Sequence, residues 1–216
     1  MADTLKLWSF HTSPFAGKVR VALAEKDVPV ELIEIHPARR PARLRELNPL
    51  GRVPVLEVDD VALSESAVIL EWLEETHPSP ALWPADPQQR ALARASACWV
   101  DEALLTNYFG GLRRKTFGVF ADEREDEGDR LLARLGRQWP RLEAALAGRD
   151  GPWLMGETFT YADVGGMPLA VRLPQWTEQL APDPDAFPLS DAWLQALRER
   201  PSAPAAEARG PERIEG

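Results

Sequence analysis

Residues 5–26 read LKLWSFHTSPFAGKVRVALAEK, and a serine at position 13 separates two patterns. Residues 5–10 form an apolar run that predicts a strand, and residues 15–26 carry apolar side chains at helical spacing. Pro14 suits the first position of a helix because its ring presets φ and the N–H that it lacks would have had no partner. We therefore expect Ser13 to be the N-cap. It is either an ordinary capping serine or a hydroxyl placed to hold an anion at the positive end of the helix dipole.

The composition is that of a globular protein, with 44% hydrophobic and 27% charged residues among 216. The net charge of −9 disfavours a surface that follows phosphates, so we expect no nucleic-acid partner. Cys98 is the only cysteine, which excludes an internal disulfide, and we expect it to be a buried packing residue. Without an apolar stretch of about twenty residues or an N-terminal targeting signal, we expect a cytoplasmic protein with no membrane partner. We expect no metal site, because no metal-ligand spacing joins the three surface or loop histidines, His11, His36 and His77.

The first eighty residues alternate between strand and helix patterns. A second strand is expected at residues 30–35, which makes a βαβ unit with parallel strands and a right-handed crossover. A short arginine-rich helix is expected at 40–47, and two strands at 52–58 and 61–63 form an antiparallel pair. A new helix begins near Ser64. The order is therefore β-α-β-α-β-β-α.

Four prolines between positions 77 and 87 mark a boundary, since this stretch cannot continue a helix. Beyond it we expect long helices at 88–116 and 124–146, with Gly118 helping to end the first. Thr160 and Asp163 have the spacing of a capping box before a further helix, and a last helix is expected at 191–200. The expected division is residues 1–77, a proline-rich linker at 78–87, an all-helical domain at 88–200 and a largely disordered tail at 201–216.

This organisation resembles the cytosolic glutathione transferases, nearest to the serine-type branches such as the plant tau class and related bacterial proteins. The resemblance implies an α/β thioredoxin-like N-terminal domain followed by an all-α C-terminal domain. Five motifs in the family's order carry it, and they cover most of the chain: Ser13-Pro14-Phe15 with Lys18-Val19-Arg20, Asn48-Pro49 with Arg52-Val53-Pro54, Leu63-Ser64-Glu65-Ser66, Leu82-Trp83-Pro84 with Arg90, and the box at Thr160 to Asp163.

The resemblance implies that glutathione is the co-substrate and that Ser13 is the catalytic residue. A serine hydroxyl can donate to the glutathione sulfur and favour the thiolate, and it needs no base because it never becomes an alkoxide. The resemblance also implies that Pro54 is cis, so that the backbone of Val53 pairs with the cysteinyl amide. From the residues alone, Pro54 is equally a proline tolerated at a strand start.

The other implied contacts hold the ends of the tripeptide. Ser66 would bind the γ-glutamyl carboxylate and Glu65 its ammonium group, although both also make an ordinary helix start. Arg40 and Arg52 would hold the glycyl carboxylate, and Arg40 is alternatively one of several solvated arginines. Phe15 completes the substrate-binding set.

We expect a glutathione S-transferase that directs the thiolate at a small hydrophobic electrophile, in conjugation, peroxide reduction or isomerisation, and the resemblance implies a homodimer. The alternative is a non-catalytic relative that binds or regulates other proteins. A thiol oxidoreductase is disfavoured because Ser13 cannot form a mixed disulfide. The residues do not specify the second substrate.

Overall fold

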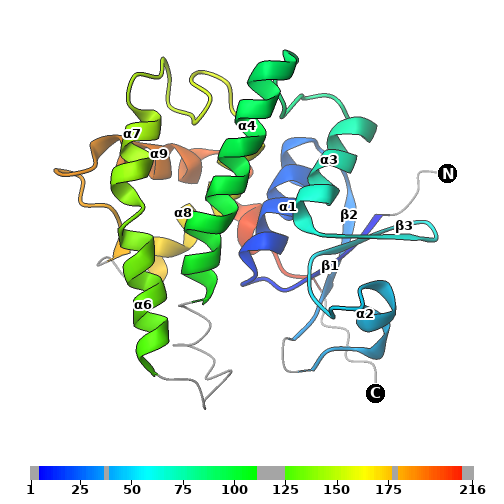
Figure 1. Cartoon of the computed structure of the whole chain (residues 1–216). Helices are drawn as coiled ribbons and strands as arrows, with labels where there is room; N and C mark the ends of the chain where they lie inside the picture. The colour runs from blue at the N-terminus through cyan, green and yellow to red at the C-terminus, as the bar shows by residue number, and fades with distance from the viewer. Residues whose placement is uncertain (1–4, 37–38, 111–124, 177–179, 211–216) are drawn as a thin grey trace. The chain divides into compact units, whose positions relative to one another are not determined.

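The computed structural model describes residues 5–36, 39–110, 125–176 and 180–210. The chain divides into two compact units (Figure 1). The first consists of Met1–Ala81 together with Pro204–Gly216, and the second of Leu82–Ala203. The boundary at residues 81 and 82 falls inside the proline-rich segment 78–87.

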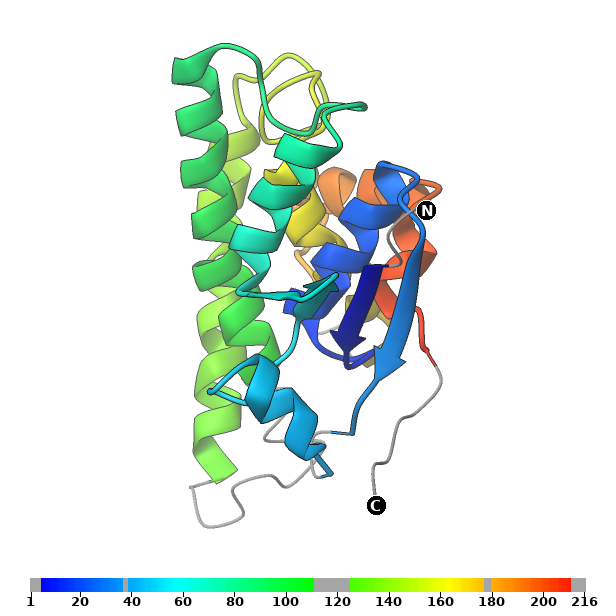
Figure 2. The ribbon, with the colours of Figure 1, turned by 90° about the vertical axis from the view of Figure 1, so that its right-hand side faces the viewer.

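A four-stranded sheet organises the first unit, with the order β2-β1-β3-β4 (Figure 2). The strands are β1 (Leu5–Ser9), β2 (Val30–Glu34), β3 (Val55–Val58) and β4 (Val61–Ser64). β1 and β2 are parallel, while β3 is antiparallel to both β1 and β4. The helices of this unit are α1 (Pro14–Glu25), α2 (Ala42–Leu47) and α3 (Ser66–Thr76). The expected order β-α-β-α-β-β-α is confirmed.

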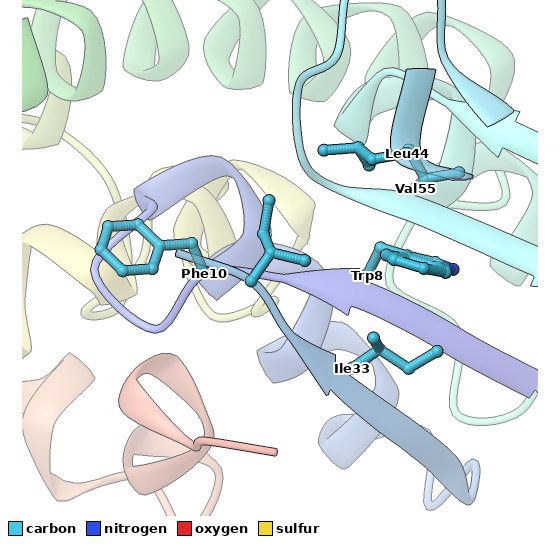
Figure 3. Close-up of a cluster of buried hydrophobic side chains, with 6 residues drawn as sticks. Trp8, Phe10, Ile33, Leu44 and Val55 are labelled. Atoms are coloured by element: carbon cyan, nitrogen blue, oxygen red, sulfur yellow. The ribbon is translucent and has the colours of Figure 1, made fainter. Parts of the chain in front are cut away.

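The two faces of the sheet are covered by different helices. Leu44 of α2 packs into a cluster with side chains from three strands (Figure 3). Successive residues of a strand point to opposite faces, so Ser9 lies on the face away from Trp8 and Phe10. Arg20 of α1 donates to the Ser9 hydroxyl, which places α1 over that second face. The cluster under α2 contains Trp8, Phe10, Ile33, Ile35, Leu44 and Val55.

The described part of the C-terminal segment is ordered, contrary to the expectation of a disordered tail. It forms the 3₁₀ helix η3 (Ala203–Glu207), and residues from Pro204 onward belong to the first unit. Ala206 is 1% exposed, and a Cβ added to Gly210 would lie 2.1 Å from the carbonyl oxygen of Leu32. The segment therefore packs closely on the edge strand β2, as Figure 2 shows in red. Residues 211–216 of the expected tail lie outside the described residues.

The described residues of the second unit are mainly helical. They form α4 (Pro87–Trp99), which continues into the π-helix η1 (Val100–Thr106), then α6 (Glu125–Gly136), α7 (Trp139–Leu146), α8 (Tyr161–Trp176) and α9 (Pro188–Glu199). The single helix expected at 124–146 is in fact two. The break has a physical cause, because the ring of Pro140 would collide with the carbonyl of Gly136 in an unbroken helix. The end of the helix expected at 88–116, with Gly118, lies outside the described residues.

Two further expectations for this unit have definite outcomes. The capping box is confirmed, since Asp163 accepts the backbone N–H of Thr160 at 2.9 Å and the Thr160 hydroxyl accepts that of Ala162 at 3.3 Å. Cys98 is exposed rather than buried. Ala93 is the one buried residue of α4, so most of this helix faces outward in the described structure. In the part of the chain that the structure describes, no helix has the length and apolar character needed to cross a membrane.

Candidate active site at one edge of the sheet

The strand registers bring the expected site segments to one edge of the sheet. Val55, the first residue of β3, pairs with Trp8 near the end of β1 and with Ser64 at the end of β4. The residues just before β3 therefore lie beside those that follow β1 and β4. Ser13, the pair at 53–54 and the pair at 65–66 consequently meet at this edge.

Ser13 is the N-cap of α1, as the sequence predicts. Its Oγ accepts the backbone N–H of Ala16 at 3.3 Å, and its carbonyl accepts that of Gly17 at 2.8 Å. The residue is 5% exposed. A serine hydroxyl can accept and donate together, so capping leaves its proton available. Within the described residues we find no acceptor for that proton.

The segment before β3 presents an unpaired backbone. The peptide bond between Val53 and Pro54 is cis, as expected. Pro54 is buried and Val53 is half-buried. In the described part of the chain, no backbone hydrogen bond involves the N–H or C=O of Val53. Both groups can therefore pair with an extended peptide, as an added strand would.

The residue before α3 has a backbone conformation that is unusual for any residue other than glycine. Glu65 is the N-cap of α3 with φ of 70°, and its side chain makes no capping hydrogen bond. A non-glycine residue in this region costs of the order of 1–3 kcal/mol, and such strain concentrates at ligand sites. Ser66, the first helical residue, is 7% exposed. With no side-chain cap from Glu65, the first N–H groups of α3 can serve an anion.

The two expected arginines meet at Gly51. Arg40 donates to the Gly51 carbonyl at 3.0 Å, while Arg52 is exposed and its carbonyl accepts from the Asn48 side chain at 2.9 Å. Arg40 is exposed as well, so both cations lie on the surface, one in the segment before α2 and one in the segment after it. Phe15 is half-buried, with the Lys18 ammonium 5.8 Å from its ring centroid.

A histidine close to Ser13 in the chain is not among the predicted site residues. His11, expected to be a surface or loop residue, has its backbone N–H 2.8 Å and its Nδ1 2.6 Å from the same oxygen of Glu34. Its Nε2 lies 2.7 Å from the guanidinium of Arg209. Arginine only donates, so the contacts fit a neutral imidazole with its proton on Nδ1. No local pattern signals this network, because its members are far apart in the sequence.

Two polar residues of the second unit, Asn107 and Tyr108, differ in exposure. Tyr108 is 1% exposed and belongs to the core of its unit, while Asn107 is half-buried and donates to the Ala103 carbonyl at 2.7 Å. No group of three or more histidine, cysteine, aspartate or glutamate side chains suited to a metal ion is present in the described ranges.

Comparison with known proteins assigns this chain to a family. Residues 7–81 match the family model "Glutathione S-transferase, N-terminal domain", and residues 98–201 match "Glutathione S-transferase, C-terminal domain". "Glutathione S-transferase U2" of Arabidopsis thaliana is 33% identical over 202 residues, which cover 91% of this chain and 85% of that protein. The chain belongs to the glutathione S-transferase family. The expected thioredoxin-like and helical fold class, and a glutathione-using enzyme, are confirmed.

Two isomerases are similar to this glutathione S-transferase. "Probable maleylacetoacetate isomerase" of Caenorhabditis elegans is 34% identical over 194 residues, covering 82% of this chain and 83% of that protein. A solved structure described as the holo structure of maleyl pyruvate isomerase, a bacterial zeta-class glutathione S-transferase, has a TM-score of 0.75. Its identity to this chain is 30%, with coverage of 93% of this chain and 95% of that one.

Proposed function

We propose that the Ser13 hydroxyl donates a hydrogen bond to the glutathione sulfur and keeps it in the thiolate form. The observation that supports this is a buried hydroxyl at a helix N-terminus whose proton has no acceptor among the described residues. The thiolate then attacks a small hydrophobic electrophile. A cytoplasmic homodimer is part of the same proposal.

The energy required is within reach of this geometry. A free thiol has a pKa of about 8.5, so only a few per cent is ionised at pH 7. Each unit by which the pKa falls corresponds to about 1.4 kcal/mol of preference for the thiolate. One hydrogen bond to the anion and the N-terminal dipole of α1 together supply about one to three units.

The rest of the tripeptide fits the groups along the same edge. The unpaired backbone of Val53 receives the cysteinyl amide, and the uncapped start of α3 with Ser66 receives the γ-glutamyl carboxylate. Glu65 accepts from the ammonium group. Arg40 and Arg52, both exposed beside Gly51, hold the glycyl carboxylate.

A second activity, isomerisation, is favoured by the two similar isomerases. In this reaction the thiolate adds to the cis double bond of a maleyl group, the resulting single bond rotates, and elimination releases the trans product with glutathione regenerated. The same stabilised thiolate serves addition to a double bond and substitution at an aromatic carbon.

The pH dependence of kcat/KM for conjugation to a chlorinated aromatic compound tests the thiolate role. In Ser13→Ala the apparent pKa of the bound thiol should rise toward the free value, with a fall in rate below pH 7 of about tenfold for each unit. Ser13→Thr keeps the hydroxyl and serves as the matched control. An unchanged pH profile in Ser13→Ala would remove Ser13 from this role.

Isomerase activity is measured separately with maleylacetoacetate and maleylpyruvate in the presence of catalytic glutathione. Turnover of either substrate, lost in Ser13→Ala, supports the isomerase proposal. Binding of glutathione without turnover of any of these substrates would instead support the non-catalytic alternative.

A further inference from the structure

Arg20 of α1 connects the Ser13 loop to the C-terminal segment. The residue is 3% exposed, and its guanidinium donates to acceptors at residues 9–11 and at residues 205–206. On one side it reaches the Ser9 hydroxyl and the carbonyls of Phe10 and His11, at 3.4 and 3.0 Å for the two carbonyls. These acceptors lie at the end of β1 and in the turn that leads from it to Ser13.

On the other side the same guanidinium holds the C-terminal segment. Its Nε donates to the carbonyl of Ala205 at 2.9 Å, and a terminal nitrogen donates to the carbonyl of Ala206. A guanidinium has five N–H groups in one rigid plane, and these contacts involve all three of its nitrogens. Because the fork is rigid, the two sets of acceptors are held in a fixed mutual arrangement.

A second bridge runs through Arg209. Its guanidinium lies 2.7 Å from His11 Nε2, and the opposite side of the imidazole is held by Glu34 at the end of β2. Gly210 follows, so close to Leu32 that a side chain at this position would collide with the strand. The segment is therefore anchored to the turn before Ser13 and to the edge strand.

We propose that residues 204–210 are part of the support of the active site, with Arg20 and Arg209 as positioning residues that fix the Ser13 hydroxyl. This inference rests on the proposed role of Ser13. A donor works on a thiolate only when it is held at hydrogen-bond distance and direction, so a looser turn weakens stabilisation of the anion more than it weakens binding of the peptide portion. The C-terminal segment thus tunes the acidity of the bound thiol.

Two variants of the full chain release the segment without touching the substrate-binding residues. Ala206→Lys forces a long cationic side chain into a position that is 1% exposed and whose backbone carbonyl accepts from Arg20. Arg209→Ala removes the donor to His11, and Arg209→Lys restores a donor and should recover the wild-type behaviour. Arg149→Ala is the control, since this exposed arginine donates within the second unit to Ala145 at 3.3 Å.

The first measurement is hydrogen exchange at the Ser13 amide, which donates to the Phe10 carbonyl at 2.8 Å. Both releasing variants should exchange about tenfold faster at this amide, because the turn opens locally more often. Exchange equal to that of the wild type in both variants would overturn the inference, whatever the protein's catalytic behaviour.

The second measurement is the pH profile of kcat/KM together with affinity for S-methylglutathione, which has no thiol proton. The releasing variants should raise the apparent pKa of the bound thiol by about half a unit, a roughly threefold loss at low pH. Their affinity for S-methylglutathione should match that of Arg149→Ala. If Ser13→Ala shifts the profile but neither releasing variant does, the inference is wrong. If Ser13→Ala shifts nothing, the proposed role of Ser13 fails instead.

Discussion

Glu143 of α7 accepts both the backbone N–H and the hydroxyl of Ser190, each at 2.8 Å. The N–H of Leu189 also donates to this carboxylate at 2.9 Å. These residues are the second and third of α9, so a side chain from one helix caps the start of another. The cap satisfies donors that have no partner within α9 itself.

This cap makes stability depend on pH. Burial by itself would raise the pKa of Glu143, but the donors on Leu189 and Ser190 outweigh it and lower the pKa below the usual 4.5. The stabilisation is therefore fully present above pH 4.5 and is lost as the pH falls through the lower folded-state pKa. Urea unfolding between about pH 3 and 6 should show a falling midpoint toward acid, and Glu143→Gln should flatten this slope. An equal slope in the variant would assign the acid sensitivity to other carboxylates.

Gly166 faces the ring of Trp193, which makes an alanine there destabilising despite its better helix propensity. A Cβ at position 166 would lie 2.1 Å from Cη2 of Trp193, and the ring is held by a 3.0 Å hydrogen bond from its Nε1 to Asp163. Gly166→Ala should lower the free energy of unfolding by about 1–3 kcal/mol.

Gly136 provides the matched comparison, because a Cβ there would have no neighbour within 4 Å. Gly136→Ala should raise the free energy of unfolding, by up to about 1 kcal/mol. Thermal unfolding of the two variants checks both signs. A stable Gly166→Ala protein would mean that the Trp193 ring moves easily.

Asp163 is expected to be the most sensitive single position in the second unit. Burial raises the pKa of this carboxyl, while its hydrogen bonds oppose the shift. One oxygen accepts from Leu154 and Trp193, at 2.9 and 3.0 Å, and the other accepts twice from Thr160. Asp163→Ala leaves buried donors without a partner and should cost about 3 kcal/mol or more.

Asp163→Asn separates the two halves of this network. Its remaining oxygen can still serve Leu154 and Trp193, whereas its amide faces the N–H of Thr160, which also donates. The loss in denaturant unfolding should therefore be smaller than in Asp163→Ala but still clear. Equal losses in both variants would show that the oxygen facing Thr160 carries the whole effect.

Ser13 has two separable roles, as a cap and as a donor to sulfur. Ser13→Ala should lower the free energy of unfolding by about 1 kcal/mol, because the N–H of Ala16 loses its acceptor. Ser13→Asp keeps a capping oxygen but places an anion beside the thiolate. We expect this variant to be as stable as the wild type and as poor a catalyst as Ser13→Ala. Unfolding and turnover measured on the same samples test the separation.

The local patterns in the sequence predict most of the first unit. The strands and the proline-led α1 of this unit depend on neighbouring residues and are confirmed, as is the box at Thr160 in the second unit. The break before α7 also has a local cause in Pro140, but the helical spacing of apolar residues over 124–146 predicts one continuous helix. The exposure of Cys98 differs because its apolar neighbours in the sequence do not surround it in the helix.

Other features depend on contacts between distant residues. Arg20 and Ala205 are separated by 185 positions, so no window of the sequence reveals that this arginine holds the C-terminal segment. His11 likewise gains its partners from residues 34 and 209. Residues 201–210 are rich in alanine and proline, and this composition predicts disorder. The segment is ordered instead by donors that lie elsewhere in the chain.

The discontinuous first unit has a consequence for synthesis in the cell. A ribosome delivers the sheet and its helices early, but Pro204–Gly210 leaves the exit tunnel only after the whole helical unit has been made. Domains generally fold as they emerge, N-terminal first. The thioredoxin-like portion therefore emerges with Arg20 lacking the carbonyls of Ala205 and Ala206, because these residues are synthesised only after the helical unit.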